Sequence, residues 1–181
     1  GNKDVSAIEA KRNPTTKAIM PVHIYGNTCD MNPIMGIAEK HGLHIIEEAA
    51  EAHGGEYKGK KASGIGQVGC FSIDANKIIT TDKGGMIVTN DPEIANSAKA
   101  LRDLAHSPDQ RFLHTDIGFN YRMTNIQAAI GLAQFERIDD LAAMRRANAK
   151  LYNQLLGDVP GILIPVEKSW ARNVSCMYSL L

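Results

Sequence analysis

The most constraining feature of the sequence is a strand–helix–strand order near its N-terminus. Residues 18–24 (AIMPVHI) and 43–46 (LHII) are apolar runs of strand length, and residues 32–41 between them have a helical composition that stops at Gly42. Such an order places two parallel strands in one sheet with the helix packed on a face. Pro21 weakens the first run as a central strand, because proline cannot donate a ladder hydrogen bond. We therefore predict an α/β fold with a mostly parallel sheet and flanking helices.

The rest of the chain continues this alternation. We predict a hairpin around residues 56–58, strands at 68–73 and 85–89, a turn followed by a strand within 157–165, and helices at 4–11, 91–104 and 124–156. Asp139 and Asp140 could mark a bend in the last helix, and the apolar end at residues 178–181 resembles the start of a further strand. The 181 residues amount to about one domain's worth of protein.

Charge and cysteine content exclude several classes of function. Lysine plus arginine and aspartate plus glutamate each number 20, so the formal net charge is zero and no long-range field attracts nucleic acid or anionic lipid. No segment approaches the roughly 20 apolar residues of a membrane span. Cys29, Cys70 and Cys176 are too far apart in sequence to suggest a disulfide scaffold or a zinc site. We expect a soluble cytoplasmic protein with reduced thiols, no metal, and neither nucleic acid nor membrane as a partner.

Lys77 is the first candidate for chemistry. It follows the strand predicted at 68–73, and apolar Ile78 and Ile79 come directly after it. Apolar surroundings favour the neutral amine, which is a nucleophile that can form a Schiff base with a carbonyl. The alternative is a solvated surface lysine, and local sequence alone favours that alternative.

Glu48 and Glu51 form a second candidate group, at the end of the apolar strand 43–46. Ligands of open α/β sheets gather at the carboxyl ends of strands, where a carboxylate could face a cofactor ring nitrogen. The alternative is that both acids belong to the first turn of a helix, where they favour the helix dipole.

The remaining candidates are weaker. Small polar groups at Ser72, Thr80 and Thr81 and the pair Gly84-Gly85 could hold a phosphate, although the glycines could equally form only a turn. The sequence contains no G-x-S-x-G elbow, no P-loop and no G-x-G-x-x-G, so acyl hydrolase, NTPase and Rossmann interpretations lack support.

Four linked stretches together resemble the DegT/StrS family of sugar aminotransferases. They are PVHIYG (21–26), IIEEAAEAHGGEYKGKK (45–61), GCFSIDANKIITTDKGGMIVTND (69–91) and GFNYRMTNIQAAIGLAQ (118–134). The resemblance implies a pyridoxal 5'-phosphate enzyme of the aspartate aminotransferase fold type, and it runs along the chain from about Asp4 in the order and spacing of the family.

The resemblance also implies roles for individual residues. Lys77 falls at the position of the Schiff-base lysine, and Glu48 falls where the family usually has the aspartate that faces the pyridine nitrogen. Glu51 matches a Gln/Glu position near the phenolic oxygen of the cofactor. Ser72 matches a serine that contacts the cofactor phosphate, and Asn120 matches an asparagine that reaches the phosphate in the partner subunit of a homodimer.

The substrates follow from the same resemblance. His53 and Arg122 lie in motif positions on the substrate side of the site. NKIITT and the ending NVSCMYSLL are most similar to the branch that aminates C4 of GDP-4-keto-6-deoxymannose for surface polysaccharide (O-antigen) synthesis, with an amino acid, expected to be glutamate, as the donor.

The resemblance divides the chain and leaves alternatives. Residues 1–123 correspond to the second half of the cofactor-binding large domain, 124–156 to a long connecting helix, and 157–181 to the start of a truncated small domain, because the chain is about half as long as the family. A related 3-dehydratase branch carries histidine at the lysine position, so Lys77 counts against it. A non-catalytic fragment with a role in assembly is favoured by Glu48 in place of aspartate and by the missing half.

Overall fold

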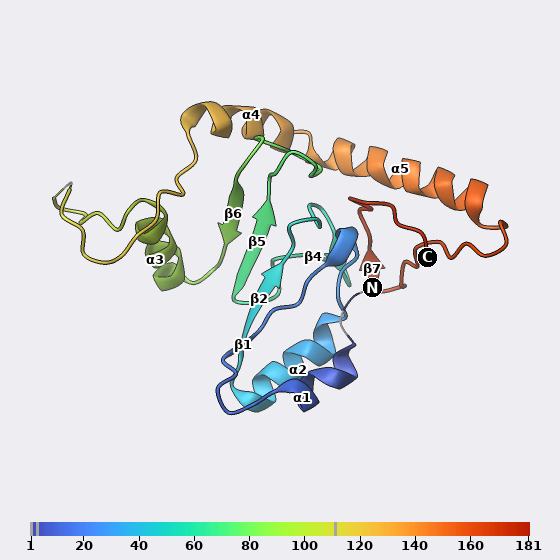
Figure 1. Cartoon of the computed structure of the whole chain (residues 1–181), viewed down its shortest axis with the longest axis horizontal. Coiled ribbons are helices and arrows are strands. Elements are labelled where there is room, and N and C mark those ends of the chain that lie inside the picture. Colours follow the sequence, from blue (N-terminus) through green and yellow to red (C-terminus); the bar gives the residue numbers. More distant parts are fainter. Residues whose placement is uncertain (1, 3, 111) are drawn as a thin grey trace.

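A four-stranded sheet forms the centre of the computed structural model, which describes residue 2 and residues 4–110 and 112–181 (Figure 1). The strands lie in the order β1 (Ala18–Ile19), β2 (His44–Glu48), β5 (Val68–Ser72) and β6 (Gly85–Val88). The first three run parallel, and β6 is antiparallel to β5. The predicted α/β class with a mostly parallel sheet is confirmed.

A second, antiparallel sheet joins distant parts of the chain. The predicted hairpin is present as β3 (Glu56–Tyr57) and β4 (Lys60–Lys61), and β3 also pairs with β7 (Ala171–Arg172). The sequence did not predict β7, because two residues carry no recognisable periodicity. This pairing brings the C-terminal segment back to the middle of the chain.

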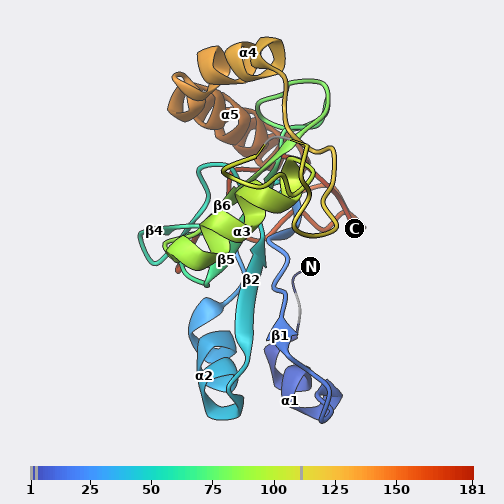
Figure 2. The same cartoon turned by 90° about the vertical axis from the view of Figure 1, so that its left-hand side faces the viewer.

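The helices lie at two ends of the sheet. The short helices η1 (Val5–Ala7) and α1 (Ile8–Lys11) lie near α2 (Met31–His41), on the side away from α4 (Asn125–Phe135) and α5 (Ile138–Leu156) (Figures 1 and 2). The remaining helices are η2 (Ile24–Gly26) and α3 (Pro92–Arg102). Within the described part of the chain, no helix is both long and apolar enough to cross a membrane.

Local sequence signals determine where most helices begin and end. The side chains of Asp4 and Asp91 accept backbone N–H groups of η1 and α3, as N-caps do. Thr124 and Gln127 form a capping box at the start of α4. Gly42 ends α2 in the left-handed conformation, with φ of 60°.

Three sequence predictions were wrong in detail. The strand predicted at 18–24 is interrupted after β1, and after Pro21 only the isolated bridge between Val22 and Glu48 continues it. The helix predicted at 124–156 is two helices, and Asp139 and Asp140 lie in the first turn of α5, where their charge favours a helix start.

The third error concerns the C-terminal strands. No strand forms at 157–165 or 178–181 in the described residues. Leu163 and Leu181 exchange two backbone hydrogen bonds, of 2.7 and 3.1 Å, but the pairing extends no further. An apolar run becomes a strand only when a neighbouring strand satisfies its backbone groups.

Two apolar clusters stabilise the fold. One packs α2 against β1 and β2, and its buried members include Met31, Ile34 and Ile45. The other joins the loop after β5 to α5 and the C-terminal segment, through Ile78, Ala142 and Val174 among others. The second cluster fixes the loop that contains Lys77.

A buried carboxylate anchors the end of β2. Glu47 is fully buried and accepts N–H groups of Ser63, Ile65 and Gly66 at 2.9, 2.7 and 2.6 Å, as well as Nε2 of His23 at 3.0 Å. Burial alone would raise the pKa of Glu47, but the hydrogen bonds from His23 and the three backbone groups together lower it. Glu47 thus holds the loop at residues 63–66 against β2.

Substitution of Glu47 by glutamine should destabilise the fold. A glutamine amide turns an NH₂ group toward N–H donors, so at pH 7 we expect Glu47→Gln to lower the free energy of unfolding by about 2–4 kcal/mol in urea titrations. A lowered folded-state pKa stabilises the fold above the ordinary glutamate value of 4.5, and this effect is lost as the pH falls below it. The difference from wild type should therefore shrink in acid. Glu39→Gln, on the exposed surface of α2, is the control; equal stability of both variants would contradict this role.

Candidate active site

The loop after β5 holds Lys77 in a largely enclosed position. Backbone hydrogen bonds from Lys77 to Asp74 (3.1 Å) and from Thr81 to Ile73 (3.0 Å) shape the loop, and Ile78 is buried in the second apolar cluster. Only 13% of the Lys77 side chain is exposed. The structure therefore does not support the alternative of a solvated surface lysine.

Glu51 is the charged partner of Lys77. Its Oε1 lies 3.4 Å from Nζ of Lys77, and its side chain is 15% exposed. Its other oxygen, Oε2, accepts the backbone N–H of Tyr25 at 2.8 Å. An enclosed ammonium is costly unless it is paired, so this carboxylate stabilises the lysine charge in the folded chain.

Glu48 points to the opposite face of β2 from its neighbour Glu47, because side chains alternate along a strand. It pairs in register with Cys70 of β5, and its Oε1 accepts the N–H of Ala50 at 2.9 Å. Burial, with a smaller contribution from Glu48, raises the pKa of the Cys70 thiol. The residues after Glu48 form a turn, with a bond from Ala52 N–H to Ala49 O of 2.9 Å, so the alternative of a first helical turn is wrong.

Ser72 and His53 lie close to this region. Ser72 ends β5, and its Oγ accepts the N–H of Asp74 at 3.3 Å. The His53 ring is buried and packs on Phe71, with ring centroids 5.0 Å apart. Burial, reinforced by the charge of Lys77 and weakly opposed by the Ser72 backbone, lowers the pKa of His53 to about 4.

Asn120 and Arg122 are not brought to this group. Asn120 forms an isolated bridge with Asp103 at the end of α3, and Arg122 makes an exposed 2.9 Å ion pair with the Asp103 carboxylate. Both residues belong to the segment between α3 and α4, and the contacts described for them are with Asp103 rather than with Lys77 or Glu51.

Sequence reasoning missed two contributors to the site. Tyr25, in the PVHIYG stretch, contacts Glu51 through its backbone, and no side-chain pattern signals such a bond. Cys176 lies near both charged partners: burial and the Glu51 charge raise the pKa of its thiol, and Lys77 and Arg145 oppose that rise. Its only signal is its place in the C-terminal NVSCMYSLL stretch.

The arrangement fits an aldehyde-bearing aromatic cofactor with a phosphate. An enclosed primary amine can bind the aldehyde, and a carboxylate accompanies it to balance or accept a proton. Ser72 adds a hydroxyl at the end of a strand. The buried imidazole of His53 packs beside Ser72 on the ring of Phe71.

Comparisons with known proteins agree with this chemistry. The model of the DegT/DnrJ/EryC1/StrS aminotransferase family matches residues 1–181. GDP-perosamine synthase of Caulobacter vibrioides is 47% identical over 180 residues, which cover 99% of this chain and 48% of that protein. GDP-perosamine synthase of Escherichia coli O157:H7 is 45% identical over 150 residues, covering 83% of this chain and 41% of that protein.

A solved structure agrees over the same span. DesV of S. venezuelae, determined in complex with a ketimine intermediate, superimposes with a TM-score of 0.93 at 34% identity, covering 99% of this chain and 48% of that one. The chain thus spans about half the length of the relatives it matches. With the family model matched from end to end, the chain belongs to the DegT/DnrJ/EryC1/StrS aminotransferase family.

Proposed function

We propose that the protein containing this chain transfers an amino group from an amino acid, glutamate, to C4 of a 4-keto-6-deoxy sugar nucleotide, GDP-4-keto-6-deoxymannose, with pyridoxal 5'-phosphate as cofactor. The enclosed Lys77 amine paired with Glu51 carries this proposal, since it is the group that such a cofactor requires. Two relatives that bear the name GDP-perosamine synthase, at 47% and 45% identity, support the choice of sugar.

Each candidate residue has a place in this function. Lys77 would hold the cofactor covalently, and Glu48 would face its ring nitrogen. Ser72 would contact the phosphate, and Glu51 the phenolic oxygen. His53, neutral at pH 7 because its pKa is about 4, would line the substrate side. When bound, the cofactor supplies the electron sink for the reaction.

The protein's own contribution is proton transfer and electrostatics. A neutral Lys77 amine could take a proton from the α-carbon of the amino donor and hold it on Nζ for the next transfer, which is general acid–base work. The Glu51 carboxylate, held by Tyr25, keeps a negative charge beside the lysine whenever the amine is protonated. The apolar cluster around Ile78 limits water near this amine.

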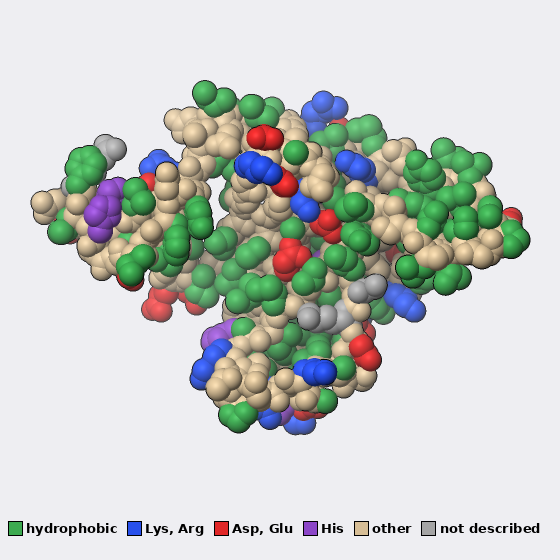
Figure 3. Space-filling model, in the orientation of Figure 1, with side chains coloured by type: hydrophobic (Ala, Val, Ile, Leu, Met, Phe, Trp, Pro, Cys, Tyr) green, Lys and Arg blue, Asp and Glu red, His purple; other side chains and the backbone are tan. Residues whose placement is uncertain are grey.

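A homodimer is part of the proposal. The segment between α3 and α4 and the start of α4 expose large apolar side chains, among them Phe112, Ile117, Tyr121 and Ile126. Figure 3 shows hydrophobic groups on the surface of both parts. Exposed large apolar side chains of this kind suit a protein interface. In the dimer, Asn120 would reach the cofactor phosphate of the partner subunit and Arg122 would lie on the substrate side.

The proposed domain division follows the family resemblance. Residues 1–123 would belong to the cofactor-binding large domain, residues 124–156, here α4 and α5, would connect it to the small domain, and residues 157–181 would begin that domain.

Cys70 and Cys176 form no disulfide with any described residue, which is compatible with synthesis of surface polysaccharide precursors in the cytoplasm.

Loss of Lys77 should abolish cofactor attachment. We expect the protein that contains this chain, loaded with pyridoxal phosphate, to show the visible absorbance of a lysine-bound cofactor and Lys77→Ala to lose it. Lys83→Ala is the matched control, because Lys83 lies in the same loop with its side chain 75% exposed. A band that persists in Lys77→Ala would contradict the assignment, and a wild-type protein that stays colourless would favour a non-catalytic role in assembly.

The charge of Glu48 should matter more than its length. Removal of an electrostatic group at a reacting centre costs on the order of 100-fold or more in rate, so Glu48→Gln should lower kcat for amino transfer by about that factor. Glu48→Asp keeps the charge and restores the residue usual in the family, so it should remain within about tenfold of wild type. Single-turnover kinetics measures both variants, and full activity in Glu48→Gln would refute a role for this carboxylate.

A further inference from the structure

We propose that residues 174–176 of the C-terminal segment act as a positioning strap: they hold the backbone of Tyr25 and Gly26 so that the Tyr25 N–H fixes the Glu51 carboxylate beside the Lys77 amine. The inference rests on the proposed role of Lys77 and adds to it residues that lie far from that lysine along the chain.

A continuous set of hydrogen bonds supports the strap. The N–H of Val174 donates to the carbonyl of Gly26 at 3.2 Å, and the N–H of Cys176 donates to the carbonyl of Tyr25 at 3.0 Å. Tyr25 in turn donates its N–H to Glu51 at 2.8 Å. The strap therefore binds the carbonyl groups of Tyr25 and Gly26, and Tyr25 is the residue whose N–H binds Glu51.

The backbone conformations on both sides of this contact are unusual. Tyr25 has φ of 56° and Ser175 has φ of 49°, in the left-handed region that residues with a side chain seldom adopt. Such conformations persist only where surrounding contacts determine them. The side chain of Asn173 supplies one such contact, because its Oδ1 accepts the N–H of Ser175 at 2.8 Å.

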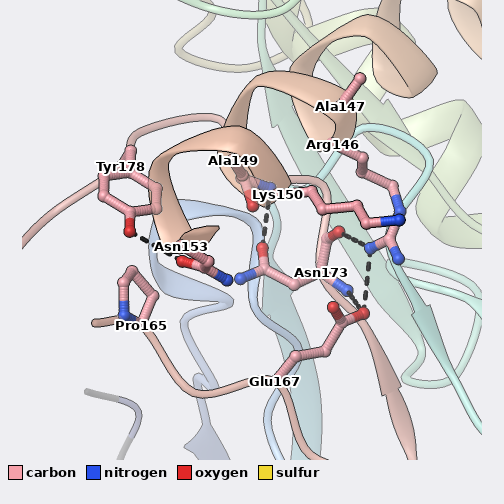
Figure 4. A pocket seen from close by; sticks show the side chains of 10 residues that line it. Arg146, Ala147, Ala149, Lys150, Asn153, Pro165, Glu167, Asn173 and Tyr178 are labelled. Atoms are coloured by element: carbon pink, nitrogen blue, oxygen red, sulfur yellow. Dashed lines mark hydrogen bonds and ion pairs between the residues drawn. The ribbon is translucent and has the colours of Figure 1, made fainter. Parts of the chain in front are cut away.

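The strap is anchored to α5. Arg146 donates to the Asn173 carbonyl and, at 2.9 Å, to the Glu167 carboxylate, which also accepts the N–H of Asn173 at 2.9 Å. Figure 4 shows these groups converging at one side of a cavity of about 330 Å³ between α5 and the C-terminal segment. The second apolar cluster continues this anchorage, since Val174 and Cys176 are buried with Ala142 of α5.

Gly26 shows how close the strap lies. A Cβ atom at this position would lie 2.7 Å from Cγ2 of Val174, 3.0 Å from the Glu51 carbonyl oxygen and 3.1 Å from the Ser175 nitrogen. Gly26→Ala would therefore push apart the strap, the Tyr25 loop and the backbone of Glu51. Gly161 provides a matched control, because its φ of 82° resembles the 92° of Gly26 but a Cβ atom there would meet no described atom within 4 Å.

The experiment measures the reactivity of Lys77 in cofactor-free protein. Protein of each variant is treated with an amine-acylating reagent at one fixed pH, and mass spectrometry gives the modification rate of Lys77. The Glu51 carboxylate lies 3.4 Å from Nζ of Lys77, so Glu51→Gln removes this contact and should raise the acylation rate roughly several-fold. Gly26→Ala should raise it several-fold, and Gly161→Ala should leave it unchanged.

The double variant Gly26→Ala/Glu51→Gln separates positioning from a general loosening of the structure. If the strap acts through Glu51, this variant should react no faster than Glu51→Gln alone. If the rate increases of the two single variants multiply in the double variant, the two substitutions act independently and the proposal is overturned. Equal Lys77 modification rates in Gly26→Ala and Gly161→Ala would also overturn it.

A second route covers the case in which Gly26→Ala does not fold. Asn173→Ala removes the acceptor of the Ser175 N–H without substituting any residue of the Tyr25 loop. By loosening the strap it should raise the Lys77 rate in the wild-type background and not in the Glu51→Gln background. If Asn173→Ala leaves the Lys77 modification rate of otherwise wild-type protein unchanged, the proposed role of the strap is overturned. The outcome is separable from that of the proposed function, because no cofactor is present and attachment of pyridoxal phosphate to Lys77 is measured independently.

Discussion

The ion pair between Lys77 and Glu51 is the interaction on which the candidate site depends. Both side chains are largely enclosed, and an enclosed charge without a partner would cost several kcal/mol. Each partner is held by a different part of the fold: the loop after β5 fixes the lysine, and the turn after β2 fixes the glutamate. The parallel pairing of β2 with β5 brings those two strand ends together.

The end of β2 places a stabilising residue next to a residue with a proposed role in cofactor binding. Glu47 faces one side of the sheet, where backbone N–H groups and His23 surround its carboxylate. Glu48 faces the other side, beside Cys70. A shift of one residue in the strand register would exchange these faces, so the buried hydrogen bonds of Glu47 also keep Glu48 on the face where a cofactor would lie.

Much of the fold was predictable because its signals are local. The caps at Asp4, Asp91 and Thr124 and the stop at Gly42 depend on a few neighbouring residues, and the predicted stop at Gly42 is present. The predictions failed where a strand needed a partner. Among the described residues of the run 157–165, one residue pairs through backbone hydrogen bonds with another segment, so no strand forms. By contrast, β7 forms because it pairs with the edge of β3.

The sequence by itself determined the α/β class, the family and the identity of the candidate residues, because hydrophobic periodicity and linked motifs are properties of the chain order. Only the tertiary structure decided which of those residues meet. It placed Glu51 beside Lys77, left Asn120 and Arg122 at the end of α3, and brought residues 174–176 against Tyr25. The physical reason is that burial and hydrogen bonding between distant segments depend on the packing of the whole chain, which no local pattern encodes.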